Sequence, residues 1–219
     1  MTAANARRGP RSKAYRTARS IVGGWTWPLR RAEVASIWRC DLSGSLPKAE
    51  ARIPIQAFVA SRAEVLGEAA QLERSRASSR DVFSRRLDEG CLCFIARSGN
   101  RLVAYNWTQY QPGDDDGSYI ALGPSEVHCL DARTVEDLRG LNIHSALLRE
   151  MLLFNAGLGY RYAYSKTVVS NRRSPKAHRR LGWERTGLML RARRVRGFPV
   201  IRLQGSTHPW RGSDPSHAP

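Results

Sequence analysis

The segment from residue 126 to residue 159 constrains the fold most strongly, because it joins a strand, a turn and a helix. Residues 126–134, EVHCLDART, alternate in character as a half-buried strand does. The helix that follows carries one apolar stripe and ends at two glycines, Gly157 and Gly159. The stripe consists of Ile143, Leu147, Met151, Phe154 and Leu158. A strand leading into an amphipathic helix predicts an α/β domain in which the helix covers a sheet.

The rest of the chain extends this pattern on both sides. The strongest hairpin signal is SGN at residues 98–100, which separates two apolar runs. Helical spacing, capping residues and glycines predict helices over residues 61–75, 78–90 and 171–182. Strands are predicted over residues 52–60, 91–97, 102–110, 119–122, 160–170, 183–193 and 198–203. This order predicts one mixed sheet with helices on both faces.

The two ends of the chain read differently from its centre. Residues 1–24 contain no acidic side chain and are expected to form a basic, flexible tail. Residues 25–52 are expected to form an N-terminal arm with one short helical pattern, at Val34, Ile37 and Trp38. The folded domain is expected over residues 53–205, and residues 206–219 are expected to form a C-terminal tail.

The formal net charge of +17 restricts the partners of the chain without choosing among them. It suits nucleic acid, an acidic membrane surface or a polyanionic cofactor. No apolar stretch reaches the ~18 to 20 residues that cross a bilayer, so no membrane span is expected. Four cysteines without a CxxC pair suggest reduced thiols in a cytoplasmic protein, and no metal site is expected. They are Cys40, Cys91, Cys93 and Cys129.

The turn before the central helix has the composition of an anion site. The first turn of a helix presents unpaired amides, and the helix dipole adds partial positive charge there. Gly140 lets a phosphate approach the backbone, and Arg139 supplies charged donors. Asn142 tolerates left-handed geometry, so it can stand where glycine is usual. An ordinary capped helix with an incidental arginine is the competing interpretation.

Two motifs in this region resemble those of the GNAT superfamily of N-acetyltransferases. The stretch Arg139–His144 resembles the family pattern Q/R-x-x-G-x-G/A, with Asn142 and His144 departing from its small residues. About thirty residues later the chain resembles the family's closing motif, at Asn171, Ser174, His178 and Leu181-Gly182-Trp183. The resemblance implies a GNAT-like mixed, mostly antiparallel twisted sheet with splayed central strands.

The resemblance also implies an acyl-coenzyme A-dependent N-acyltransferase, with acetyl-CoA or another acyl-CoA as co-substrate. The acyl group would pass directly to an amine in a ternary complex. Backbone groups of the strand end and of the turn would hold the cofactor, together with Arg139 and residues of the closing motif. These residues are Ala132, Arg133, Thr134, Arg139, Gly140, Leu141, Asn142, Ile143, His144, Ser145, Asn171 and Ser174.

Catalytic roles follow from the same resemblance. His178 stands seven residues after Asn171, where many relatives have the tyrosine that protonates the departing thiolate. Glu126 and His128 open the strand where relatives often hold a base, and the competing interpretation is an edge-facing carboxylate and a core histidine. The acceptor pocket is expected to be lined by Tyr105, Trp107 and Tyr119, for which core packing is the alternative.

Several functional alternatives stay open at this point. The acceptor could be an amine of a small molecule, a sugar, a peptide or a protein. The donor could be carried by acyl carrier protein or by aminoacyl-tRNA, since a basic surface suits both acidic carriers. A non-catalytic RNA-binding relative is a further alternative. The sequence does not choose between a monomer and a homodimer.

Overall fold

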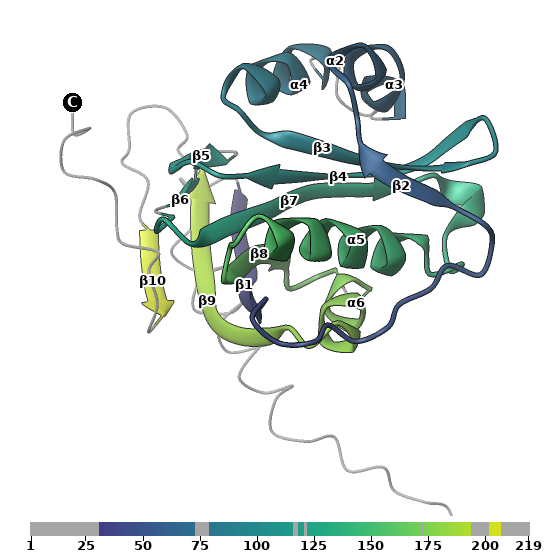
Figure 1. Cartoon of the computed structure of the whole chain (residues 1–219). Helices are drawn as coiled ribbons and strands as arrows, with labels where there is room; N and C mark the ends of the chain where they lie inside the picture. Colours follow the sequence, from purple (N-terminus) through teal and green to yellow (C-terminus); the bar gives the residue numbers. More distant parts are fainter. Residues whose placement is uncertain are drawn as a thin grey trace, which may run out of the picture. The chain divides into compact units, whose positions relative to one another are not determined.

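The computed structural model describes residues 31–72, 79–115, 118–120, 122–171, 173–193 and 202–206. The described strands form a sheet of eight in the order β10-β9-β1-β8-β7-β4-β3-β2, with a separate hairpin, β5-β6 (Figure 1). The strands are β1 (Arg31–Asp41), β2 (Gln56–Val59), β3 (Leu92–Ser98), β4 (Arg101–Gln109), β5 (Gly113–Asp115), β6 (Ser118–Ile120), β7 (Glu126–Thr134), β8 (Tyr162–Val168), β9 (Glu184–Arg193) and β10 (Arg202–Ser206). The predicted mixed α/β fold is confirmed.

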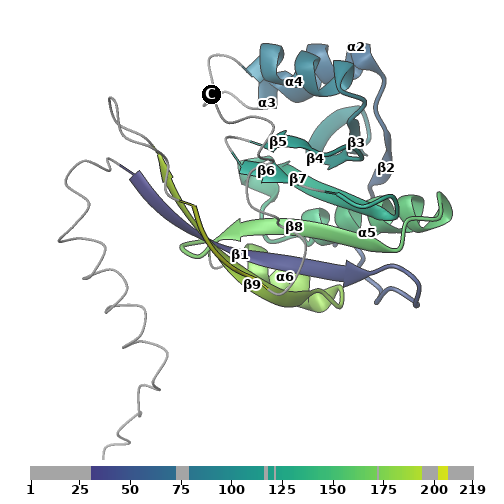
Figure 2. The same ribbon diagram turned by 90° about the vertical axis from the view of Figure 1, so that its left-hand side faces the viewer.

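Helices cover both faces of the sheet. On one face α5 (Ile143–Gly157) packs on Val127 and Cys129 of β7, and α6 (Ser174–Arg180) follows β8. On the other face lies α4 (Ser79–Asp88) (Figure 2). Its Phe83 packs on Trp107 of β4. The same core includes the π-helical turn η1 (Val65–Ala69), which lies between α2 (Arg62–Glu64) and α3 (Ala70–Leu72). The two cores take alternate residues of the same strands, as strand geometry requires.

The helical pattern expected at Val34, Ile37 and Trp38 is wrong, because these residues belong to β1. This strand pairs antiparallel with β8, from Ala35 opposite Val168 to Asp41 opposite Tyr162. Residues 35–38 are all buried, since β1 is an interior strand with cover on both faces. A strand buried on both sides loses the alternation that identifies strands in a sequence.

Most of the other predicted elements match the structure closely. β7 has the predicted bounds, α5 begins at Ile143, and Gly99 lies in the turn between β3 and β4. The strand expected over residues 198–203 begins outside the described residues, and β10 covers Arg202–Ser206. The expected tails, apart from Ser206, and residues 25–30 of the arm also lie outside the described residues.

Contacts divide the chain into two compact units. One comprises Val34–Met189 with Gln204–Pro219, and the other comprises Met1–Glu33 with Leu190–Leu203. Of the second unit, the structure describes only the parts of β1, β9 and β10 that fall within it. The candidate site lies entirely within Val34–Met189. Among the described helices, none is both long and apolar enough to cross a bilayer.

Candidate active site

The two central strands, β7 and β8, form a fork. Their parallel pairing extends from Glu126 opposite Tyr162 to Cys129 opposite Ser165 and ends there. Beyond Cys129 the ladder of β7 is with β4, and a bulge separates the pair Trp107–Leu130 from the pair Tyr105–Arg133. The sheet therefore splays where the resemblance predicted it. Ala132, Arg133 and Thr134 lie on the splayed part of β7.

The bulge in β7 depends on an unusual backbone conformation. Asp131 has φ 49°, in the left-handed region that few residues other than glycine adopt. Its carboxylate forms an ion pair with Arg86 of α4, whose guanidinium lies 5.4 Å from the ring centroid of Trp107. A partly buried charge pair and a cation–π contact thus hold β7 in shape at the fork.

The turn after β7 presents free amides at the start of α5. After the short helix η2 (Glu136–Leu138), Gly140 adopts φ 94° and Asn142 adopts φ 61° with ψ 14°, as the sequence predicted for Asn142. The first helical bond joins the Ala146 amide to the Asn142 carbonyl. No side chain caps the helix, and the amides of residues 143–145 have no hydrogen-bond acceptor among the described residues. These amides and the helix dipole favour an anion.

The surroundings of this turn are open at one side. A methyl group added at Gly140 would meet no heavy atom within 4 Å, so the backbone there is accessible. Arg139 lies beside it with its side chain 41% exposed. Its guanidinium is 3.2 Å from a carboxylate oxygen of Glu136, and its Nε donates to the Thr134 carbonyl at 3.4 Å. An exposed pair of this kind exchanges partners at little cost.

His178 is buried between two tryptophans. Its ring centroid lies 5.5 Å from that of Trp38 and 4.8 Å from that of Trp183, and 3% of the residue is exposed. Nδ1 is 2.8 Å from the Ser174 carbonyl oxygen, which only accepts, so Nδ1 carries the proton. Nε2 then has a lone pair, and it is buried with no partner among the described residues.

Burial lowers the pKa of His178, so the neutral ring prevails near pH 7. This tautomer gives Nε2 an accepting role, whereas the expected general acid needs a proton there. His144, half-buried in the first turn of α5, is electrostatically coupled to it. Burial, and then the nearby His178, lower the pKa of His144 to about 4.

Asn171 and Ser174 lie at the N-terminal end of α6. The Oδ1 of Asn171 accepts from the amides of Arg173 and Ser174, at 3.1 and 3.2 Å. Asn171 is exposed, and Ser174 opens the helix. Asn171 and Ser174 therefore lie at the start of the helix that carries His178, and Asn171 is accessible.

The expected bases lie on the face of the sheet opposite α5. Val127 and Cys129 contact α5, so Glu126 and His128 point the other way by alternation. Glu126 is buried and accepts from the Gly123 amide at 2.8 Å and from the Tyr164 hydroxyl at 3.2 Å. Nδ1 of His128, fully buried, is 3.3 Å from Oε1 of Gln109.

Tyr164 is a site residue that the sequence analysis did not select. It lies opposite His128 in the β7–β8 register, and this pair precedes the last pair before the fork, which is Cys129 with Ser165. Burial, and then the charge of Glu126, raise the pKa of the Tyr164 phenol. Its position in an alternating run of tyrosines was visible, but its pairing with Glu126 requires the register of two strands.

The three aromatic residues expected to line an acceptor pocket are placed differently. Tyr105 and Trp107 are fully buried and pack edge to face on Phe83, at 5.3 and 5.0 Å between centroids. This placement favours their alternative role in the core. Tyr119 belongs to β6, and its side chain lies outside the described residues.

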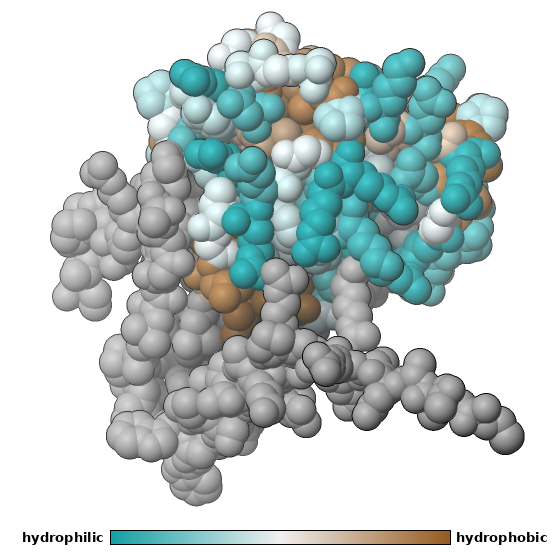
Figure 3. Space-filling model, turned by 90° about the horizontal axis from the view of Figure 1, so that it is seen from below, coloured by the Kyte–Doolittle hydropathy of each residue, from teal (hydrophilic) through white to brown (hydrophobic). Residues whose placement is uncertain are grey.

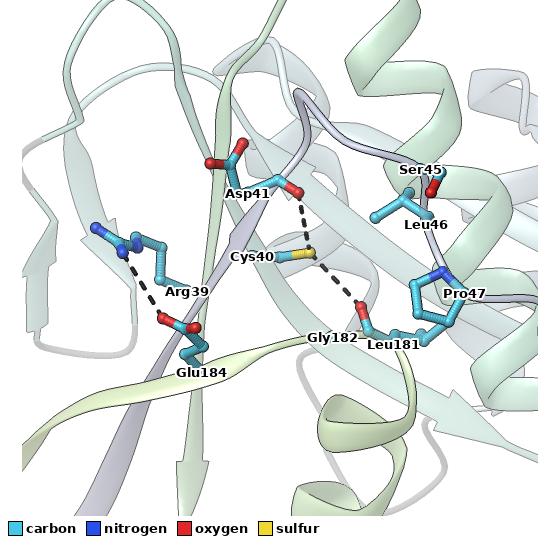
Figure 4. Close-up of a pocket in the computed structure, with 9 residues that line it drawn as sticks. All are labelled: Arg39, Cys40, Asp41, Ser45, Leu46, Pro47, Leu181, Gly182 and Glu184. Carbon is cyan, nitrogen blue, oxygen red and sulfur yellow. Dashed lines mark hydrogen bonds and ion pairs between the residues drawn. The ribbon is translucent and has the colours of Figure 1, made fainter.

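A separate hollow of about 290 Å³ lies at the far end of β1 (Figure 4). Cys40 contacts the carbonyls of Asp41 and Leu181 there, each at 3.8 Å, and Arg39 lies 3.8 Å from Glu184. Burial, and then Asp41, raise the pKa of the Cys40 thiol to about 12, which makes it a poor nucleophile. The lining residues are Arg39, Cys40, Asp41, Ser45, Leu46, Pro47, Leu181, Gly182 and Glu184.

Sequence comparisons find no relative: no protein-family model matches the chain, and no curated protein is significantly similar to it. Solved structures are similar in fold. A GCN5-related N-acetyltransferase from Sphaerobacter thermophilus superposes with a TM-score of 0.59 at 15% identity, over 86% of this chain and 58% of that chain.

Two other bacterial structures agree with this likeness. A protein from Novosphingobium aromaticivorans assigned to the GNAT acetyltransferases gives a TM-score of 0.53 at 17% identity, over 75% of this chain and 65% of that one. A GNAT-family acetyltransferase from Colwellia psychrerythraea gives 0.52 at 12% identity, over 80% and 59%. The chain thus has the GNAT fold and spans about three fifths of the length of these structures.

Proposed function

We propose that this chain, with the fold of the GNAT acetyltransferases, is an acyl-coenzyme A-dependent N-acyltransferase. The proposal rests mainly on one juxtaposition. The fork between β7 and β8 opens just before α5, whose first-turn amides have neither a capping side chain nor an acceptor among the described residues. A thioester arm in the fork and a diphosphate on the amides would satisfy both features together.

The donor is proposed to bind along the splayed part of β7. The diphosphate would accept from the amides of residues 143–145, with Gly140 allowing close approach and Arg139 leaving Glu136 to pair with it. The pantetheine arm would run beside the backbone of residues 132–134. Asn171 and Ser174 would border this arm from α6. His178 would face it with an accepting nitrogen.

The reaction is proposed to be a direct attack. The neutral amine nitrogen bonds to the thioester carbonyl carbon, the carbon–sulfur bond breaks, and coenzyme A leaves as a thiolate. The amine proton passes to a base, and the thiolate takes up a proton, which gives an amide and free coenzyme A. A backbone N–H near Cys129 or Leu130 would stabilise the oxyanion. Glu126, held by Tyr164, and His128 are the proposed proton acceptors on the opposite face.

Binding of coenzyme A to the full chain is the first test. Isothermal titration should give saturable binding at micromolar concentrations, and Arg139→Gln should weaken it. Arg149→Gln is the matched control, because this arginine lies on the same helix and donates to the Pro47 carbonyl, away from the turn. If the unaltered chain does not bind coenzyme A, the proposal is overturned.

The second test is acyl transfer. Thiol release from acetyl-CoA should respond to a panel of small-molecule, amino-sugar and peptide amines, and Asn171→Ala with His178→Ala should suppress it. A parallel series with acyl carrier protein as donor examines the alternative carrier. Binding of coenzyme A without thiol release across the whole panel would favour a non-catalytic role.

A further inference from the structure

The connection between β1 and β2, residues 42–55, lies along α5 and along the turn that precedes it. The Arg52 amide donates to the Leu141 carbonyl at 2.8 Å, and the Asn142 side-chain amide donates to the Glu50 carbonyl at 2.6 Å. Further along the helix, Arg149 Nε donates to the Pro47 carbonyl at 3.1 Å. The connection thus contacts the helix at the turn and again about two turns later.

The connection also contributes to the core. Its inward side chains pack on the cluster that α5 shares with the sheet, and they are Leu46, Ala49, Ala51, Ile53 and Ile55. Its exposed positions are mostly polar, and the described residues seen from below in Figure 3 are mostly hydrophilic with apolar patches between them. In Figure 1 it runs as the purple-to-blue segment from β1 past α6 to β2. Its partly buried side chains and its hydrogen bonds to α5 therefore make the connection a packed part of the domain.

Asn142 is unusual for the residue at the N-cap of a helix. A helix-capping asparagine normally has an extended backbone and turns its side-chain oxygen onto the first-turn amides. Asn142 instead has a left-handed backbone, makes no capping bond, and directs its side-chain nitrogen to Glu50. Its side chain consequently leaves the first-turn amides to an external anion and engages the connection.

We propose that Asn142 is a positioning residue for the donor site, and that its bond to Glu50 makes the 42–55 connection part of that site. This inference rests on the proposed function, because the ligand it concerns is the diphosphate of an acyl-coenzyme A. The Arg52 amide holds the peptide between Leu141 and Asn142 through the Leu141 carbonyl, and the bond to Glu50 holds the Asn142 side chain. The amides of residues 143–145 then need no reordering when the anion arrives, which preserves affinity.

Two requirements together select asparagine at this position. The left-handed backbone restricts the residue to glycine, asparagine or aspartate at low cost. The Glu50 carbonyl requires a donor, which glycine and aspartate both lack. β1 leads directly into the connection, so the bond joins the segment after this strand to a turn that lies 92 positions after Glu50.

The experiment compares Asn142→Gly with Asn142→Asp and Arg149→Gln. Asn142→Gly permits the left-handed backbone and removes the side-chain donor, so the dissociation constant for coenzyme A should rise about two- to tenfold, the range for one neutral hydrogen bond. Asn142→Asp should weaken binding more, since its carboxylate would repel both the diphosphate and the Glu50 carbonyl. Arg149→Gln removes a bond from the same connection outside the turn and should stay within about twofold.

Hydrogen exchange provides a readout that a purely structural role would not change. In the unaltered chain, coenzyme A should slow amide exchange in residues 141–145 and also in residues 49–53. In Asn142→Gly it should slow only the first set. With activity present, the KM for the donor should rise while the KM for the acceptor stays constant.

The outcomes separate this inference from the proposed function. If the unaltered chain does not bind coenzyme A, both are overturned. If it binds and Asn142→Gly binds equally well with the same exchange protection, only the positioning role fails. Equal weakening by Asn142→Gly and Arg149→Gln would also refute it, because the connection would then act through general stability. Thermal unfolding of each variant verifies that the chain is folded.

Discussion

Trp38 donates its indole N–H to the Thr167 hydroxyl oxygen at 2.8 Å, across 129 positions of sequence. Both residues are buried, with 2% and 6% of their surface exposed. Trp38 belongs to β1 and Thr167 to the part of β8 beyond the fork, so the bond joins the N-terminal strand to the splayed strand. The same indole lies 5.5 Å from the ring of His178, between centroids. The first described strand is therefore built into the candidate site.

Trp38→Phe is expected to lower the free energy of unfolding by about 1–3 kcal/mol, because it leaves the buried Thr167 hydroxyl without its donor. Trp38→Ala should cost about 3–5 kcal/mol, since it adds a large cavity. Urea denaturation followed by fluorescence measures both. Trp38→Phe combined with Thr167→Val should recover part of the loss. A Trp38→Phe variant as stable as the unaltered chain would show that the bond contributes nothing.

The pH dependence of stability should reflect the two coupled histidines. Burial, and then His178, hold the pKa of His144 at about 4, against an ordinary value of 6.5, and burial also lowers the pKa of His178. Below pH 6.5 the unfolded chain binds protons that the folded chain does not. The contribution of these two histidines to the free energy of unfolding is therefore fully present above about pH 6.5, and it is lost as the pH falls toward 4.

Denaturant titrations between pH 4.5 and 7.5 measure this loss, and His144→Gln should flatten the curve. Carboxylates such as Asp41 and Asp137, whose pKa values are lowered by hydrogen bonds, lose their contribution at lower pH, below their ordinary value of 3.8. The two windows are thus separable. Parallel curves for the variant and the unaltered chain would contradict the coupling of His144 to folding.

The strand-turn-helix segment was predicted well from the sequence, because the strand, the helix and the turn each have a local pattern that matches the structure they adopt. β7 alternates, α5 has one apolar stripe, and asparagine tolerates the left-handed backbone found at Asn142. The partner of Asn142 could not be predicted, because Glu50 contributes a carbonyl, and every residue has one. Local propensity identifies a conformation, whereas a distant backbone acceptor emerges only from the fold.

β1 and the surroundings of His178 also depend on tertiary packing, which local sequence patterns do not reveal. Burial on both faces removed the alternation of residues 35–38, so the strand resembled a short helix. The environment of His178 includes Trp38, and it therefore could not be anticipated without β1. Likewise, Tyr105 and Trp107 lie in the core because α4 covers them, a matter of tertiary packing.

Glu136→Gln is expected to strengthen coenzyme A binding about two- to threefold, as surface electrostatics of this size allow. The substitution releases Arg139 from a pair of 3.2 Å and removes a negative charge near the proposed diphosphate site. Titration calorimetry measures the change, which should diminish as salt is raised. Asp137→Asn is the matched control, since Asp137 pairs with Arg101, at 2.7 and 2.9 Å. An equal gain in both variants would point to net charge alone.

Arg86→Gln is expected to lower the free energy of unfolding by about 3 kcal/mol, because it leaves the Asp131 carboxylate in a partly buried place without its guanidinium. Asp131→Asn keeps a residue that accepts the left-handed backbone, and the double variant should lose less than the sum of the two single losses. This non-additivity measures the interaction free energy between Arg86 and Asp131, and it requires denaturant unfolding of the unaltered chain, the two single variants and the double variant.

Because the pair holds β7 at the bulge where the fork opens, Arg86→Gln should also reduce kcat/KM for acyl transfer at least tenfold at temperatures where the variant is fully folded. If the variant is destabilised but its kcat/KM is unchanged, the ion pair contributes to stability only and the geometry of the bulge does not affect acyl transfer.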